Sequence, residues 1–203
     1  NPNSKPIFKW SNNYSWTFNG NLAGKSQLTE MVEAKGGRTD GVFRFTHSWN
    51  ELEPNQSLMD LHVFMPGCVV PKTGGGPNVT GRRVGWNHRT DALSGGTQDV
   101  DYTSAAPKGY VPVENITFPT LSKMPDGVYT CAIHNWNFRG TGGRGKAEIA
   151  FQGNLFQYEY PATKHHQWVV VAEVTLKNGQ FSIEHKLPLV GESTKEVYGV
   201  ETN

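Results

Sequence analysis

The sequence predicts an all-β protein, an antiparallel β-sandwich of the jelly-roll-like or immunoglobulin-like kind with an extended N-terminal arm. Residues 58–67, LMDLHVFMPG, alternate between two faces and stop at a Pro-Gly pair, which is typical of a half-buried strand that ends in a turn. Asn178-Gly179 separates two further strand-like runs, and this dipeptide is a strong β-hairpin signal. About eight short runs of this kind, with turn residues between them, indicate a sandwich or barrel.

Residues 1–40 form the predicted arm. Its first twenty residues or so are rich in Asn, and its aromatic side chains follow no strand periodicity. Such side chains would expose a sizeable apolar patch unless something covered them. We therefore expect the arm to contact a protein partner or a second copy of the chain through Trp10, Tyr14, Trp16 and Phe18. Residues 26–34, SQLTEMVEA, place apolar residues at helical spacing and predict a short helix.

Residues 41–190 contain the predicted strands, and residues 191–203 are a predicted polar tail. GVFRFTHSW puts Phe43, Phe45, His47 and Trp49 on one face of the first strand. PVENITFP carries a proline at each end of its strand, which favours either an edge position in the sheet or an irregular strand. The apolar faces of the other runs predict a central core that contains Val63, Tyr129, Ile133 and Val170.

Composition and charge narrow the classes of partner. The formal net charge is +1 and charged residues make up 18% of the chain, so no overall field attracts nucleic acid or acidic lipid, and we expect neither as a partner. No apolar run approaches the ~20 residues needed to cross a bilayer. The sequence begins without Met, which indicates a processed precursor or a fragment of a longer protein. We expect a location in a virion or at the cell surface.

The two cysteines, Cys68 and Cys131, are too few for a disulfide framework and are not spaced as a zinc site. Cys131 lies in an alternating strand and is predicted to be a buried thiol. A bridge between the two depends on their separation, which the sequence does not supply, so that alternative stays open.

The sequence contains partial matches to nucleotide-binding motifs whose flanking residues do not fit, and it contains no catalytic signature. FRGTGGRGKAE fits GxGxxG and part of a phosphate loop, but a strand-like run follows where those motifs need a helix. There is no GxSxG elbow and no HExxH helix. His165 and His166 are adjacent, so they are predicted to be loop residues and not joint ligands. We therefore expect no enzyme, with an unrecognised hydrolase as a lesser alternative.

Six tracts occur in an order and spacing that resemble the YfaP-like domain: MDLHVFMPG, GWNHR, GGTQDVDY, PVENITFP, PDGVYTCAIHNW and WVVVAEVTLKNGQ. That family, of unknown function, occurs in bacterial exported proteins and phages and is distantly similar to bacterial pre-peptidase C-terminal domains. The resemblance implies a non-catalytic accessory β-sandwich. The family commonly reads DLDLHV, whereas this chain has Leu58 in place of the first Asp.

Acidic residues of these tracts are the candidate cation ligands. Asp60 and His62 lie two residues apart on one strand face, where they could jointly bind a cation or orient a loop. Asp99 and Asp101 are spaced in the same way, and we expect both to lie close to Asp60. Calcium, which needs six to eight oxygens, would lack the ligand lost at Leu58. An arginine-centred cluster is therefore favoured over a calcium site, and scattered exposed carboxylates are the third alternative. The arginines that could form this cluster are those of the intervening segment, Arg82, Arg83 and Arg89.

The leading functional prediction is a non-enzymatic structural or interaction module of a surface or particle assembly, such as a capsid-decoration or tail-associated phage protein. The alternative is a carbohydrate-binding or adhesion module of an exported bacterial protein, because Trp86, Trp136 and Trp168 could offer flat faces to sugar rings. Trp136 lies near a loop and suits this role, whereas Trp168 lies in an apolar strand and suits a core. No cofactor other than the calcium alternative is predicted.

Overall fold

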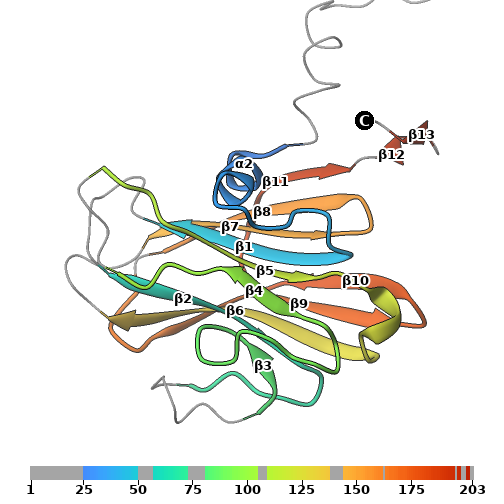
Figure 1. Cartoon of the computed structure of the whole chain (residues 1–203), viewed down its shortest axis with the longest axis horizontal. Coiled ribbons are helices and arrows are strands. Elements are labelled where there is room, and N and C mark those ends of the chain that lie inside the picture. Colours follow the sequence, from blue (N-terminus) through green and yellow to red (C-terminus); the bar gives the residue numbers. More distant parts are fainter. Residues whose placement is uncertain are drawn as a thin grey trace, which may run out of the picture.

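The computed structural model describes residues 25–49, 57–72, 81–104, 109–137, 144–161, 163–194, 196–197 and 200–201. Two antiparallel sheets pack face to face, which confirms the predicted β-sandwich (Figure 1). The strand order of the larger sheet is β11 (Leu189–Thr194), β8 (Asn154–Tyr160), β7 (Gly145–Phe151), β1 (Phe43–Trp49), β5 (Val113–Phe118) and β4 (Thr97–Val100). The order of the smaller sheet is β10 (Gln180–His185), β9 (Trp168–Lys177), β6 (Gly127–Asn137), β2 (Leu58–Phe64) and β3 (Arg83–Val84).

The remaining described elements are short. They are α2 (Gln27–Ala34), the 3-10 turn η2 (Leu121–Lys123), and a small hairpin of β12 (Glu196–Val197) and β13 (Val200–Glu201). Among the described residues, no helix is both long enough and apolar enough to span a membrane. The four aromatic residues assigned to the arm lie outside the described part of the chain.

The core lies between the two sheets and confirms most of the predicted set. Val63, Tyr129 and Ile133 are fully buried in it. The prediction that Val170 lies in the core is wrong, because this residue is only partly buried. The β6–β9 register passes from Cys131↔Ala172 to Ala132↔Val170, so that the intervening Val171 has no residue opposite it. This bulge changes the alternation and places Val171, not Val170, in the core.

Strand β5 occupies an interior position, between β1 and β4, and not the predicted edge. Its two flanking prolines, Pro112 and Pro119, lie just outside the strand, so neither removes a ladder hydrogen bond. The edge strand on this side of the sheet is β4.

Helix α2 confirms the predicted short helix and covers the outer face of the larger sheet (Figure 1). Ser26 caps it, because its hydroxyl accepts the N–H of Thr29 at 3.1 Å. Val32 of the helix is fully buried and packs with Val100 and Val113 of the sheet below. The helix therefore belongs to the folded domain and does not lie in a free arm.

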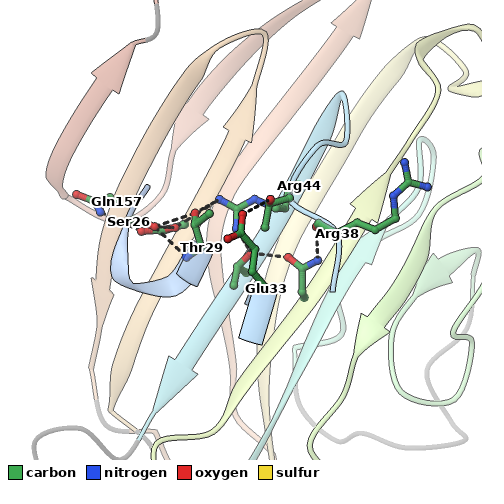
Figure 2. Close-up of polar contacts among 10 residues, drawn as sticks. Ser26, Thr29, Glu33, Arg38, Arg44 and Gln157 are labelled. Carbon is green, nitrogen blue, oxygen red and sulfur yellow. Dashed lines mark hydrogen bonds and ion pairs between the residues drawn. The ribbon is translucent and has the colours of Figure 1, made fainter. Parts of the chain in front are cut away.

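A buried ion pair lies beneath this helix. Because Phe43 and Phe45 point into the core, Arg44 between them points outward, and it lies 3.5 Å from Glu148 of β7. Arg44 also donates to the hydroxyls of Thr46 at 2.9 Å and Thr29 at 3.0 Å. Figure 2 shows Ser26, Thr29 and Arg44 converging between α2 and the sheet. Polar contacts to β1 and β7 thus fix the helix in place.

At the C-terminal end, the sandwich continues past the predicted boundary at residue 190. Strand β11 pairs with β8 as far as Thr194↔Asn154, so residues 191–194 belong to the sheet and are not a tail. The predicted hairpin at Asn178-Gly179 is confirmed, since both residues have positive φ, 52° and 77°. Cys68 and Cys131 are both free, and Cys131 is buried as predicted.

Candidate functional site

The candidate site lies where strand β2 is left unpaired on one side. Strand β3 pairs only with Val63 and Phe64 of β2, so the first half of β2 has no strand neighbour on that side. The chain that follows β4 lies there instead. Leu61 and Val63 point into the core, so Asp60 and His62 point to the opposite face of β2.

A buried carboxylate, Glu114 of β5, holds these segments together. It accepts the backbone N–H of Leu61 at 2.9 Å and that of Tyr102 at 3.3 Å. The side-chain amide of Gln98 donates to it at 3.3 Å, and His47 Nε2 lies 3.3 Å away. Burial raises the pKa of Glu114 well above its usual range, and the negative charges of Asp60 and Asp101 raise it further.

Next to this network is a cavity of about 260 Å³. It is lined by Leu58, Asp60, Trp86, Asp101, Tyr102, Thr103 and Trp136. The rings of Trp86 and Trp136 are tilted by 39° with their centroids 5.7 Å apart, and the indole N–H of Trp86 is buried without a hydrogen-bond partner. The cavity thus combines two half-buried indoles and two carboxylates.

Two imidazoles lie behind Asp60. His62 and His134 are both buried beside Trp168: the His134 ring stacks on the indole with a centroid distance of 4.3 Å, and the His62 ring is tilted by 53° to it at 4.9 Å. His134 Nδ1 is 3.8 Å from Asp60 Oδ2, which is too long for a hydrogen bond. Burial lowers the pKa of His62 well below its usual value, and it raises the pKa of the Asp60 carboxyl. Burial therefore favours the neutral form of the His62 imidazole.

The structure brings together two of the three predicted acidic residues. Asp60 and Asp101 line the same cavity, but the placement predicted for Asp99 is wrong. Its carboxylate accepts the N–H of Arg38 at 2.6 Å and the amide of Asn115 at 2.7 Å. The cause is a bulge in β4, where the register passes from Gln98↔Ile116 to Val100↔Asn115 and leaves Asp99 unmatched.

The three arginines of the predicted cluster lie in different places. Arg89 is 3.8 Å from the Asp101 carboxylate. Arg82 instead pairs with Asp91 at 2.8 Å, and Arg83 donates to Asn87 at 2.9 Å. Arg89 is thus the arginine of the predicted cluster that pairs with an acidic residue of the cavity.

The aromatic residues named as candidates also lie in different parts of the chain. Trp136 lines the cavity, as its position near a loop suggested, whereas Trp168 packs with Phe64 and Ala132 in a small cluster away from the central core. The adjacent pair predicted to be loop residues, His165 and His166, does lie in a turn. The other predicted interaction residues, Trp10, Tyr14, Trp16 and Phe18, lie outside the described residues.

Sequence reasoning did not find Glu114 or His134 as parts of the site. Their partners come from distant parts of the chain: Glu114 accepts from Leu61 and Tyr102, and His134 is opposite Asp60 in the β2–β6 register. An acidic or imidazole side chain in a predicted strand is a usable signal, because buried charges are rare without a partner.

No family model matches the chain, and no curated protein matches it either. The geometry of the site is therefore the basis for the function proposed next.

Proposed function

We propose that this chain is a non-enzymatic binding module whose cavity takes a saccharide. One observation carries the proposal: the indoles of Trp86 and Trp136 share a cavity with the carboxylates of Asp60 and Asp101. Sugar rings present apolar C–H faces, which pack on indoles, and hydroxyl groups, which donate to carboxylates.

The size of the cavity limits the ligand. Pockets for drug-sized ligands are roughly 300–1,000 Å³, and this cavity, at about 260 Å³, is slightly smaller. It therefore suits one sugar unit, such as the end or a side branch of a longer glycan. Cys131 supports a role without covalent chemistry, because burial raises the pKa of its thiol well above the usual range and keeps it protonated.

Binding to an array of glycans, followed by calorimetric titration of the best ligand, tests the proposal. We expect Trp136→Ala to weaken binding at least tenfold and Trp136→Phe, which keeps an aromatic face, to weaken it less. Leu93→Ala is the matched control, because Leu93 is an exposed apolar residue that does not line the cavity. Binding of no glycan, or equal binding by Trp136→Ala, would overturn the proposal. A preference for organic cations would replace the saccharide with an amine ligand, since carboxylates and indoles also suit a cation.

A second candidate is a structural module of a surface or particle assembly, such as a virion. The observation that favours it is strand β11, an edge strand of the larger sheet on which Leu189 and Val190 are exposed. Open strand edges with apolar residues are templates for pairing with another chain. Light scattering of the full chain and of a variant that lacks residues 1–20 tests this candidate, including the proposed contact through the arm. An oligomer that the deletion dissociates supports assembly, and a monomer in both cases contradicts it.

A further inference from the structure

We propose that Asp60, His62 and His134 form a binding site for one divalent transition-metal ion, with zinc as the best-fitting example. The three side chains are 7%, 1% and 0% exposed. One ligand atom from each can be chosen so that all three lie within 4.8 Å of one another. This inference goes beyond the proposed saccharide site and does not depend on it.

The sheet itself positions the three residues. Asp60 and His62 are two residues apart on β2 and therefore share a face, and His134 of β6 is directly opposite Asp60 in the register. All three come from central strands of the smaller sheet, not from loops. The indole of Trp168 packs against both imidazoles, stacked on His134 and tilted by 53° to His62, and restricts the movement of their rings. Rigid placement of this kind is what a metal site needs.

The hydrogen bonding of the three side chains points to a missing ligand. Among the residues that the structure describes, no hydrogen-bond partner is found for the buried Asp60 Oδ2 or for either ring nitrogen of His62 and of His134. Buried polar atoms in proteins nearly always have a partner, so this many unpaired atoms at one place need an explanation. A metal ion accepts one lone pair from each imidazole and one from the carboxylate at the same time.

An ion pair between His134 and Asp60 would leave more of these buried atoms unpaired than a metal ion would. His134 and Asp60 could approach each other from their 3.8 Å separation, but both nitrogens of His62 would stay unpaired. The pocket around His62 is also closely fitted. A Cβ atom on Gly85 would lie only 2.2 Å from His62 Nδ1, so the glycine makes room for this imidazole. The chain thus accommodates a buried histidine that an ion pair would not use.

The donor set selects the class of ion. Two imidazole nitrogens and one carboxylate oxygen suit zinc and its first-row neighbours, whereas calcium prefers an all-oxygen shell. Ligand atoms bonded to a tetrahedral zinc ion lie about 3.4 Å apart. Metal binding would therefore draw the three groups together from their spacing of up to 4.8 Å. Asp60 also lines the cavity, so one of the three proposed ligands is next to a space that a small ligand could enter.

Metal titration of the tag-free full chain, after treatment with chelator, tests the proposal. We expect one Zn²⁺ per chain by calorimetry and elemental analysis, at least 100-fold weaker binding of Ca²⁺, and a Co²⁺ complex with visible absorption bands of a low-coordinate site. Zinc should also raise the melting temperature of the wild-type chain, because an ion that binds only the folded state stabilises it.

Matched variants separate the site from adventitious binding. His62→Gln and His134→Gln should each lose at least tenfold in zinc affinity and lose the Co²⁺ bands. Three controls should keep both: His166→Gln, whose imidazole stacks on His134; Asp101→Asn, a carboxylate of the same cavity; and Cys68→Ser, a partly exposed thiol. Circular dichroism and metal-free melting would show whether each variant folds. If a ligand variant does not fold, the zinc stoichiometry, Co²⁺ spectrum and melting shift of the wild type decide.

Three results would overturn the proposal: no zinc binding by the folded wild type at micromolar metal, equal affinity for calcium, or unchanged affinity in both folded histidine variants. Saccharide binding by chelator-treated protein would leave the metal test unaffected, and zinc binding without saccharide binding would contradict only the proposed function. The two proposals therefore fail separately.

Discussion

The carboxylate of Glu114 accepts the backbone N–H of Leu61 at 2.9 Å, and this bond joins β5 of one sheet to β2 of the other. A strand neighbour would normally accept this N–H, but β3 stops short of it. Because Glu114 also accepts from Tyr102, the same carboxylate anchors the segment that carries Asp101 into the cavity. One side chain thus takes the place of a missing strand and positions part of the candidate site.

Glu114→Ala is therefore expected to destabilise the fold by about 3–5 kcal/mol. The change leaves the N–H groups of Leu61 and Tyr102 buried without an acceptor, and each such group costs roughly 1–3 kcal/mol. Glu114→Gln keeps an acceptor oxygen and should cost about half as much. Urea unfolding measures both values, and a loss below about 1 kcal/mol for the alanine variant would mean that water replaces the carboxylate.

The stability of the fold should depend on pH through two buried residues of this network, His47 and Glu114. Burial lowers the pKa of His47 to about 3. The unfolded chain binds this proton below about pH 6.5, so the contribution of His47 is full above that pH and is lost as the pH falls toward 3. The pKa of Glu114 is raised, so the folded chain keeps a proton that the unfolded chain releases. Its contribution is full below about pH 4.5 and is lost as the pH rises.

Two variants separate these contributions. His47→Gln should reduce the loss of stability as the pH falls from about 6.5 toward 3, and Glu114→Gln should reduce the loss as the pH rises above about 4.5. Each group contributes a slope of at most about 1.4 kcal/mol per pH unit. Urea midpoints at half-unit pH steps measure the difference between each variant and the wild type. A difference that does not change with pH would show that the residue does not titrate as stated.

Local pattern was sufficient to predict the sandwich, the short helix and the Asn178-Gly179 hairpin, because alternation, helical spacing and turn chemistry are properties of neighbouring residues. It failed for Val170 and Asp99. In both cases a β-bulge inserts a residue whose presence depends on the partner strand. The site was predictable only in part for the same reason: Asp60 and His62 share a strand, but His134 meets them through long-range pairing.

The bulge in β9 leads us to expect different losses of stability when two neighbouring valines are truncated. Val171→Ala removes two methyl groups from a fully buried side chain and should cost about 2 kcal/mol. Val170→Ala, which affects a partly buried side chain on the other face, should cost less than about 1 kcal/mol. The pair is a matched comparison of neighbours with the same chemistry. Equal losses in urea unfolding would mean that the bulge lies elsewhere in the strand.

The last prediction concerns the ion pair between Arg44 and Glu148 beneath α2. Arg44 and Glu148 are 4% and 3% exposed, so removing either partner leaves the other charge buried without its counterion. Glu148→Ala should destabilise the fold by about 3–5 kcal/mol. It also removes the acceptor for the Ser26 hydroxyl at the start of the helix (2.6 Å), so hydrogen exchange in α2 should accelerate.

The double variant Arg44→Met/Glu148→Leu decides whether the charges or the packing stabilise this layer. Buried ion pairs can often be replaced by apolar residues of similar volume at little cost, because both desolvation penalties disappear together. We expect the double variant to be more stable than Glu148→Ala alone, although Thr29 and Thr46 lose their donor. Urea unfolding of Arg44→Met, Glu148→Leu and the double variant gives the coupling energy directly. Additive losses would show that Arg44 and Glu148 act independently, and the helix would then be fixed mainly by the packing of Val32 against the sheet.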